Sequence, residues 1–380
     1  MKKKSILFVS ENASALFGLK GHHLFGGAEV QSYYIANGLS KDFKVNFVIR
    51  NNSLPRQQKY NKLTLFKLKH PVPKGPFSVW ISNIAHLFRI DYFRDVMDLF
   101  FFGAKKKPDV LLTRAPGSMA FKVYLTSRLL GKKFVYMVAH DTDCEKKHPL
   151  LKKKISQMTF NYAVRHADYI IAQSKKQARK LNSIGIRKVR VIRSGYPPAN
   201  DKTIQRKDQI LWVSRAEKWK RPELLVKLAK SMPEYQFLMI CPGFNQYPDY
   251  GMDFVAEICN TPNIEFIDFV PFPKMDRFFQ EAKIFINTSK YEGFPNTFVQ
   301  AWKNGTPVVS TEVNPDGIIT KERLGHVSPT IQSMKYHIKE LMTDQDQYRR
   351  ISKNCVQIYQ QRFHINKTLE GHKKLYQELL

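Results

Sequence analysis

Residues 284–310 constrain the fold more than any other part of the chain. An apolar run at residues 284–288 predicts a buried strand, and a second apolar run ends at Ser310. Between them, Pro295 stands where a helix of about ten residues would begin, and Gly305 stands just past its end. Apolar residues recur at helical spacing in this interval, at Phe298, Val299, Ala301 and Trp302. The order of strand, loop, helix and strand predicts parallel strands with helices packed against them.

The loop before this helix has the geometry of an anion site. The first amide groups of a helix have no partner within it, and the helix dipole places partial positive charge there. We therefore expect a phosphate group to bind where the loop ends and the helix begins, at Phe294, Pro295, Asn296 and Thr297. Gly293 has no Cβ and lets a ligand approach closely. A phosphate would repel the adjacent Glu292, so that carboxylate should face another group, such as sugar hydroxyls that donate hydrogen bonds to it.

A second segment, residues 210–225, repeats the order of strand, loop and helix. Arg215 and Lys220 follow the buried strand, at the edge where open α/β sheets bind ligands. Arginine binds phosphate oxygens through two donors and lysine supplies a compact charge, so the pair suits a diphosphate. The adjacent Arg221 is predicted to be an ordinary exposed residue.

Together, the two segments resemble the donor-binding signature of family 4 glycosyltransferases, which have the GT-B fold. The resemblance rests on the Glu-Gly-Phe-Pro motif that begins at Glu292, on the helix and Gly-x-Pro-Val-Val motif after it, and on Arg215 and Lys220 upstream. In that family one glutamate contacts the donor sugar and a second glutamate holds the ribose hydroxyls. Glu292 matches the first glutamate, and Gly293 beside it is expected at the same sugar-binding site. Gln300 stands at the second position, and its amide oxygen can still accept a ribose hydrogen bond.

The first half of the chain supplies further matches to this family. An apolar strand at residues 5–10 is followed by Gly26 and Gly27, which open a helix. This order resembles the family's glycine loop, which closes on the donor phosphates or the acceptor, although a glycine pair also occurs in ordinary turns. His140 ends another apolar strand and resembles the active-site histidine that faces the donor sugar. The alternative for His140 is a hydrogen bond to the backbone at the strand end.

Asp141 and Asp143 follow this histidine and raise the alternative of a metal site. An Asp-x-Asp pair at a strand end binds manganese in a different glycosyltransferase fold, because hard cations take carboxylate oxygens. Two cationic side chains for a diphosphate are already present at Arg215 and Lys220. We therefore expect a reaction that needs neither a metal nor another cofactor.

Strands at residues 238–243 and 264–271 resemble those that line the nucleobase pocket of the family. This resemblance implies base contacts from Gly243, Phe269 and Val270. Asp268 stands where the family usually has glycine. The identity of the base therefore stays open, and a UDP or GDP sugar is expected as the donor.

Length and composition agree with two domains. The chain has 380 residues, 43% of them hydrophobic, which is enough for two cores. The resemblance implies an α/β fold of the GT-B type, with two Rossmann-like domains whose parallel sheets face a central cleft. We expect the acceptor-side domain at residues 1–198, the donor domain at 199–365, and a C-terminal helix at 366–380 that crosses back to the first domain.

Positive charge is concentrated in the first half of the chain. Residues 1–200 hold 37 Lys and Arg against 11 Asp and Glu, a net charge of +26, whereas residues 201–380 carry +4. The lysine-rich runs would attract an anionic membrane or an acidic polymer. An ordinary solvated face is the alternative.

Aromatic residues recur near helical spacing across residues 77–102, just before a run of three lysines. This pattern indicates either a core helix or a helix at a membrane surface. Acidic residues within the segment argue against deep insertion, and it is too charged to span a bilayer.

The location of the protein follows from two observations. The apolar run after Met1 and three lysines stops at Val9, which is too short for a secretory signal. The four cysteines are scattered, which suits reduced thiols and forms no zinc motif. We expect a cytoplasmic protein, with peripheral binding to the cytoplasmic face of the membrane left open.

The resemblance implies a retaining hexosyltransferase that moves a sugar from a nucleotide diphosphate sugar to a hydroxyl group. The expected acceptor is a lipid-linked or cell-surface glycan precursor, as in polysaccharide biosynthesis. Three alternatives remain: a nucleotide-sugar epimerase, an inactive GT-B scaffold suggested by Gln300, and a polyanion-binding protein suggested by the net charge of +30. No nucleic-acid-binding module is recognisable, so no nucleic-acid partner is expected.

Overall fold

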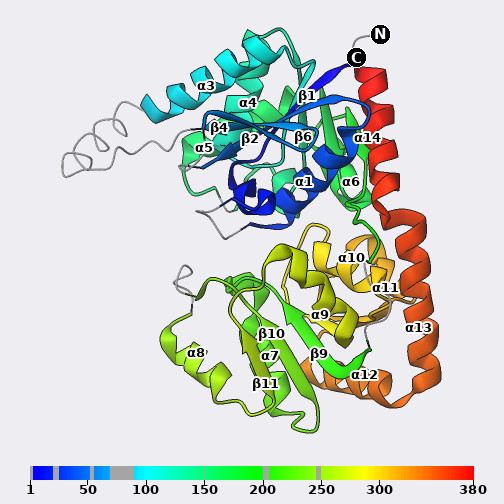
Figure 1. Cartoon of the computed structure of the whole chain (residues 1–380). Helices are drawn as coiled ribbons and strands as arrows, with labels where there is room; N and C mark the ends of the chain where they lie inside the picture. The colour runs from blue at the N-terminus through cyan, green and yellow to red at the C-terminus, as the bar shows by residue number, and fades with distance from the viewer. Residues whose placement is uncertain are drawn as a thin grey trace. The chain divides into compact units, whose positions relative to one another are not determined.

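The computed structural model describes residues 3–19, 25–51, 55–68, 90–149, 151–199, 205–244 and 250–380. The chain divides into two compact units, Met1–Ile192 with Thr368–Leu380, and Arg193–Lys367. The sequence predicted divisions after residues 198 and 365. Each unit is an α/β domain built on a sheet whose strands are all or mostly parallel (Figure 1).

The first unit contains an eight-stranded sheet with the order β3-β4-β2-β1-β5-β6-β7-β8. All its pairings are parallel except that of β3 with β4. The strand β1, Ser5–Val9, is buried along its whole length because strands flank it on both sides. The other elements are η1 Glu11–Phe17, α1 Gly27–Leu39, β2 Lys44–Arg50, β3 Gln57–Tyr60, β4 Leu63–Leu68, α3 Ile90–Lys106, β5 Val110–Thr113, α4 Ser118–Leu129, β6 Lys133–Met137, η2 Asp141–Cys144, α5 Lys154–Arg165, β7 Tyr169–Ala172, α6 Lys175–Ser183 and β8 Val189–Val191.

The second unit contains a six-stranded parallel sheet with the order β11-β10-β9-β12-β13-β14. This is the doubly wound order, in which the chain builds one half of the sheet outwards and then returns to build the other half. The switch point lies between β9, Lys207–Val213, and β12, Ala282–Asn287. The other elements are η3 Lys218–Lys220, α7 Pro222–Lys230, β10 Gln236–Ile240, α8 Met252–Cys259, β11 Ile264–Ile267, η5 Phe272–Lys274, α9 Met275–Glu281, α10 Asn296–Lys303, β13 Val308–Ser310, η6 Pro315–Gly317, α11 Ile318–Lys321, β14 Gly325–Val327, α12 Ile331–Thr343, α13 Gln345–Ile358 and η7 Tyr359–Phe363.

The last helix, α14 Ile365–Leu379, packs against the first unit. Tyr376 is fully buried and meets the ring of Phe43 edge to face, with ring centroids 6.0 Å apart. Lys373 forms an ion pair with Asp42 at 2.5 Å. These contacts explain why the end of the chain belongs to the unit that contains its beginning.

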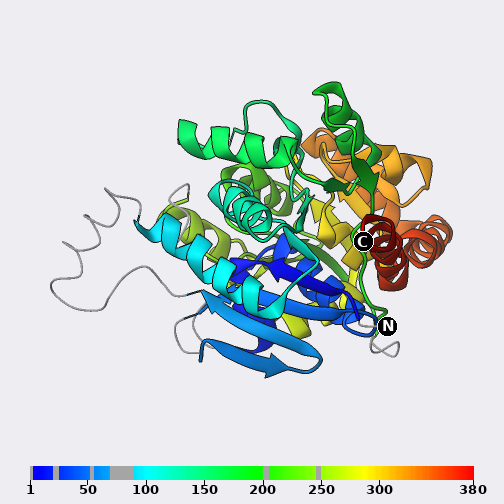
Figure 2. The same cartoon turned by 90° about the horizontal axis from the view of Figure 1, so that it is seen from above.

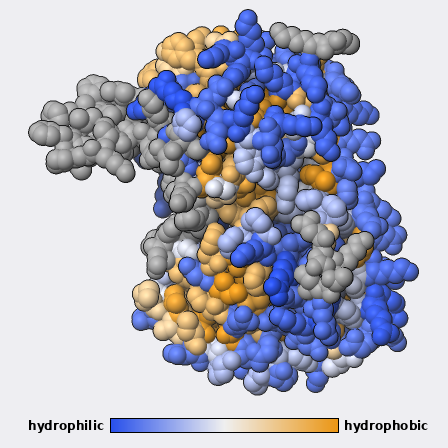
Figure 3. Space-filling view, viewed as in Figure 1, coloured by the Kyte–Doolittle hydropathy of each residue, from blue (hydrophilic) through white to orange (hydrophobic). Residues whose placement is uncertain are grey.

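The structure describes only part of the aromatic segment at residues 77–102. The part before α3 lies outside the described residues. On α3, Leu99 and Phe102 are buried in the core, whereas Phe93 and Phe101 are exposed. This helix packs on α4, which packs on α5, and the three lie side by side in Figure 2. Figure 3 shows a hydrophobic patch over α3, so one apolar face of the helix reaches the surface.

Within the described ranges, no helix combines the length and the apolar character needed to cross a bilayer.

Candidate functional site

The two predicted phosphate-binding segments meet because β9 and β12 are adjacent parallel strands. Ile210 pairs with Ile284 and Leu211 pairs with Phe285, so the loops after the two strands leave the same edge of the sheet. This edge, at the switch point, is where open α/β sheets bind ligands.

Lys220 and Glu292 form an ion pair at this edge. Their side chains are largely buried, with exposed fractions of 15% and 12%. Ser289 donates a hydrogen bond from its hydroxyl to Glu292 Oε1 at 2.8 Å. The carboxylate is thus oriented by an ammonium group and a hydroxyl. The sequence pointed to Lys220 and Glu292 separately, whereas their pairing and the contribution of Ser289 emerge only from the structure.

A chain of hydrogen bonds joins the two loops. The Trp212 indole N–H donates to Thr288 Oγ1 at 2.9 Å, and the Thr288 hydroxyl donates to the Lys220 carbonyl at 2.6 Å. The rings of Trp219 and Tyr291, one from each loop, stack with centroids 6.2 Å apart. The backbone of Lys220 is therefore held by contacts that do not depend on its side chain.

Arg221 is not the ordinary exposed residue that the sequence predicted. Its guanidinium donates to the Thr288 carbonyl at 2.6 Å, to Thr311 Oγ1 at 2.8 Å and to Glu312 Oε1 at 2.7 Å. Thr288 follows β12 and Thr311 follows β13, so Arg221 ties its own loop to two neighbouring strand ends. Its φ of 51° lies in the left-handed region, which is unfavourable for a residue with a Cβ.

Arg215 also has an acidic partner. Its Nη2 lies 2.9 Å from Oε1 of Glu217, which is buried, whereas 40% of the Arg215 side chain is exposed. Each of the two predicted phosphate-binding cations therefore pairs with a carboxylate in this structure. A bound diphosphate would compete with these carboxylates for the same donors.

Helix α10 begins one residue after the predicted start. Pro295 is its N-cap residue, and the ring of Phe294 packs against Phe363 with centroids 5.2 Å apart. The buried Oδ1 of Asn296 accepts no hydrogen bond from the described part of the chain. The predicted phosphate-binding residues are thus the last two of the loop and the first two of the helix: Phe294, Pro295, Asn296 and Thr297.

Gln300 and Gly293 are both buried close to this helix start. Gln300 lies four residues after Asn296, and residues at this spacing share a helix face. The backbone carbonyl of Gln300 accepts a hydrogen bond from the Asn304 side chain at 2.9 Å. The spacing of four residues places Gln300 on the same side of α10 as Asn296, whose side-chain oxygen has no partner among the described residues.

The predicted base-binding residues follow β10 and β11, which are neighbouring strands. Gly243 has a φ of 93°, and its N–H donates to Asp268 Oδ1 at 3.4 Å. Phe269 is 38% exposed and Val270 is buried. Asp268 therefore contacts the turn at Gly243, from a position where the resemblance led us to expect glycine.

In the first unit, His140 follows β6 and caps η2. The Thr142 N–H donates to His140 Nδ1 at 3.3 Å, and the Thr142 hydroxyl lies 3.0 Å from the same nitrogen. This is the backbone-bonded arrangement that we considered as the alternative. Because Nδ1 accepts this bond, a neutral ring carries its proton on Nε2. The catalytic role of His140 stays a prediction.

The two aspartates after His140 serve different partners. Asp143 is buried and accepts a hydrogen bond from the Tyr136 hydroxyl at 2.8 Å, and its other oxygen lies 3.1 Å from His148 Nε2. Burial raises the pKa of Tyr136, so the phenol stays a donor. Asp141 forms an ion pair with Lys176 at 3.0 Å. The carboxylates therefore do not converge on one point.

The predicted glycine pair does open a helix. α1 begins at Gly27, and the N–H of Gly26 donates to the Glu29 carboxylate at 2.8 Å. The N–H of Gly26, one of the two glycine amides, therefore already has a hydrogen-bond partner within the chain.

Two family models match the chain. The one described as Glycosyl transferases group 1 matches residues 199–357, and the one described as Glycosyltransferase Family 4 matches residues 25–200. No curated protein matches the sequence.

Several solved structures are similar along the whole chain. Sucrose-phosphate synthase from Thermosynechococcus elongatus has a TM-score of 0.78 at 16% identity, and the alignment covers 99% of this chain and 99% of that one. Alr3699/HepE from Anabaena in complex with UDP-glucose has a TM-score of 0.70 at 16% identity, covering 98% of this chain and 99% of that one. The lipopolysaccharide outer core galactosyltransferase WaaB has a TM-score of 0.65 at 16% identity, with 99% and 100% covered. At these identities the likeness shows the fold alone.

Proposed function

Because the chain belongs to the group 1 and family 4 glycosyltransferases and has the GT-B fold, we propose that it is a retaining hexosyltransferase that uses a nucleotide diphosphate sugar. The observation that carries this proposal is the meeting of Arg215, Lys220 and Glu292 with the start of α10 at one sheet edge. A UDP or GDP sugar is the donor in this proposal. HepE, one of the similar structures, was solved with UDP-glucose.

In the proposed reaction, the leaving diphosphate gains negative charge as its bond to the sugar breaks. Arg215, Lys220 and the amides at the start of α10 stabilise that charge. When Lys220 turns to the phosphates, Glu292 keeps its hydrogen bond from Ser289 and accepts others from the sugar hydroxyls. His140, in the first unit, is our candidate for contact with the reacting sugar.

We further propose that the transfer needs no metal ion. Arg215 and Lys220 already supply two positive charges for the diphosphate. Asp141 and Asp143, which raised the metal alternative, are held by other side chains of the first unit and point to different partners. The expected consequence is transfer that is insensitive to chelators.

The acceptor that we propose is a lipid-linked or cell-surface glycan precursor, reached at an anionic membrane surface. Phe93, Met97 and Phe101 are exposed at intervals of four residues on α3, so they form one apolar stripe, and Lys105 and Lys106 end the same helix. Burial lowers the pKa of Lys106, and the charges of Lys44, Lys105 and Lys59 lower it further. An apolar stripe beside clustered cations suits an anionic lipid surface.

Nucleotide binding tests the donor site directly. Thermal unfolding and calorimetry with UDP, GDP, ADP and CMP should find one diphosphate that raises the unfolding temperature, with or without EDTA. Arg215→Ala should abolish the effect, whereas Lys218→Ala, an exposed lysine of the same loop, should preserve it. If no diphosphate binds at millimolar concentration, the proposed donor site is wrong.

An inactive scaffold is the second candidate because Gln300 replaces the expected glutamate. For an active enzyme, Glu292→Gln should abolish sugar transfer and Gln300→Glu should change the affinity for the donor. A scaffold should be indifferent to both changes. Product analysis without acceptor separates the remaining alternative, because an epimerase converts its donor without one.

A further inference from the structure

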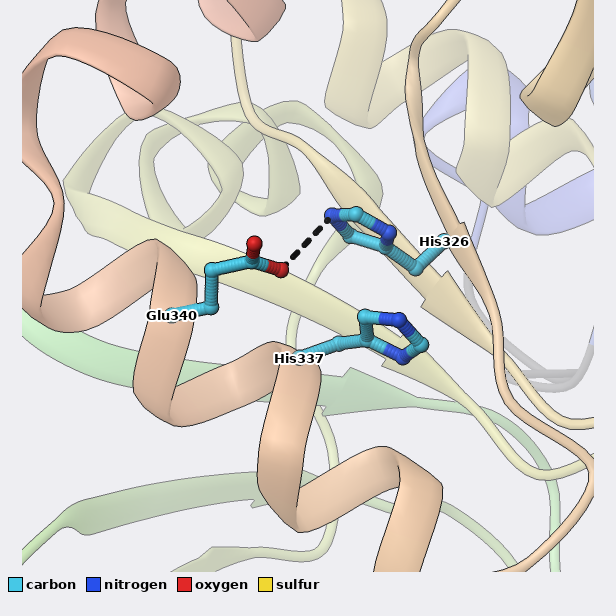
Figure 4. A group of neighbouring side chains, drawn as sticks. All are labelled: His326, His337 and Glu340. Carbon is cyan, nitrogen blue, oxygen red and sulfur yellow. Dashed lines mark ion pairs between the residues drawn. The ribbon is translucent and has the colours of Figure 1, made fainter.

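Three side chains outside the candidate donor site converge in the second unit: His326, His337 and Glu340 (Figure 4). We propose that they bind one divalent transition-metal ion, with Zn²⁺ the expected metal, and that the ion links the edge strand β14 to α12. They share no residue with the donor site, so this proposal and the proposed function can fail separately.

The fold brings these residues together from two successive elements. His326 is the middle residue of β14 and pairs with Val309 of β13. His337 and Glu340 lie three residues apart on α12, so they share one helix face. Figure 4 shows that face turned toward the strand, with the two rings one above the other. The connection is short, and Thr330 fixes the helix start by accepting a hydrogen bond from the Ser333 N–H at 3.1 Å.

The distances suit ligands of one ion better than they suit direct contacts. One donor atom from each of the three side chains lies within 4.8 Å of the other two. His326 Nε2 and Glu340 Oε2 are 3.7 Å apart, which is too far for a hydrogen bond. Two ligands of a tetrahedral zinc ion are about 3.3 Å apart, since each lies about 2.0 Å from the metal. This pair therefore needs to close by only a few tenths of an ångström. The His337 ring must also turn out of its stack on His326, because two parallel rings cannot both have one ion in their planes.

The surroundings favour neutral imidazole rings, which are the form that binds metal ions. The rings of His326 and His337 stack with centroids 4.1 Å apart and planes within 11°, an arrangement that two imidazolium cations would oppose. Two imidazole nitrogens and one carboxylate oxygen also make a ligand set typical of zinc.

The remaining polar contacts agree with a metal site. The Ser328 hydroxyl lies 2.8 Å from His337 Nδ1, and the Ser328 N–H donates to the Ser310 carbonyl at 2.7 Å. A ligating histidine commonly donates its second ring N–H to such an oxygen, which leaves the Nε2 lone pair for the metal. His326 Nε2 is buried and has no hydrogen-bond partner among the described residues. The nitrogen that faces Glu340 is thus available as a ligand.

Cobalt substitution tests the site without reference to sugar transfer. The full chain, free of any affinity tag and stripped with EDTA, is titrated with Co²⁺ and then with Zn²⁺. One equivalent of Co²⁺ should give visible absorption bands, one equivalent of Zn²⁺ should remove them, and Zn²⁺ should raise the unfolding temperature.

Three conservative variants locate the binding. His326→Gln, His337→Gln and Glu340→Gln should each weaken Co²⁺ binding at least tenfold while leaving the circular dichroism spectrum unchanged. The controls His166→Gln and Glu257→Gln, at exposed positions elsewhere, should bind as the wild type does. The proposal is overturned if the wild type gives no bands with Co²⁺ in excess, or if all three variants bind as tightly as the wild type.

Discussion

Lys220 and Glu292 form an ion pair although 72 residues separate them in the chain. The parallel pairing of β9 with β12 brings them together, because each residue follows the carboxyl end of one of these strands. The Ser289 hydroxyl is a further donor to Glu292. Removal of Lys220 therefore takes the compensating charge from a largely buried carboxylate.

Replacing Lys220 with methionine should weaken diphosphate binding at least tenfold and lower the free energy of unfolding by about 3 kcal/mol. The second effect arises because Glu292 loses its cation. The double variant Lys220→Met with Glu292→Gln should recover stability but not binding, since a neutral amide needs no counter-charge. Chemical unfolding and calorimetric titration with UDP and GDP measure the two effects. Recovery of binding in the double variant would contradict the phosphate-binding role of Lys220.

Replacing Arg221 with alanine should lower the free energy of unfolding by about 2 to 3 kcal/mol, because the bonds to Thr288, Thr311 and Glu312 are lost. Arg221→Gly should cost about 1 kcal/mol less than the alanine change, since glycine adopts a φ of 51° without strain. Urea unfolding compares the two variants, with Lys218→Ala expected within about 0.5 kcal/mol of the wild type. Equal stability of the alanine and glycine variants would show that the backbone is not strained there.

Changing Phe93, Met97 and Phe101 together to serine should reduce co-sedimentation with anionic vesicles several-fold without altering the circular dichroism spectrum, because all three side chains are exposed. Tyr336→Ser, which removes an exposed aromatic residue of the second unit, should have no effect. Vesicles of neutral lipid should bind the wild type weakly, since clustered lysines contribute to the attraction. If the triple variant sediments like the wild type, the stripe on α3 does not contact the membrane.

Asp95, one of the acidic residues of α3, does not oppose membrane binding. It faces inwards, where it forms ion pairs with Arg50 at 2.9 Å and with Lys122 at 2.6 Å. Its charge is therefore compensated inside the first unit and is not presented on the apolar stripe.

His372 should make stability depend on pH. It is buried on α14, and burial, followed by the charge of Arg114, lowers its pKa to about 3 from an ordinary value of 6.5. The stability associated with the neutral ring is complete above about pH 6.5 and is lost as the pH falls from there toward 3, because only the unfolded chain then binds the proton. At pH 5 the loss is about 2 kcal/mol.

The variant His372→Gln isolates this contribution. Between pH 7.5 and pH 5 it should lose less stability than the wild type in urea unfolding followed by circular dichroism. His166→Gln, at an exposed position, should lose as much as the wild type. The same pH dependence in all three proteins would mean that His372 is not held neutral.

The sequence by itself determined the local order of the elements and the family. The apolar runs at residues 284–288 and before Ser310 correspond to β12 and β13, and Pro295 and Gly305 enclose the short helix α10. These features depend on burial, turn residues and helix ends, which are properties of neighbouring positions in the chain. The resemblance to family 4 glycosyltransferases rested on the same motifs, and the family models confirm it.

Only the tertiary structure decided which side chains meet. Arg221 looks like any exposed arginine in the sequence, and it becomes a tie between loops because β12 lies beside β9 and β13 lies beside β12. His337 and Glu340 could be placed on one helix face from their spacing, but His326 joins them only because β14 lies against α12. A linear pattern records the period of each element and not the order of the strands, and contacts between distant residues depend on that order.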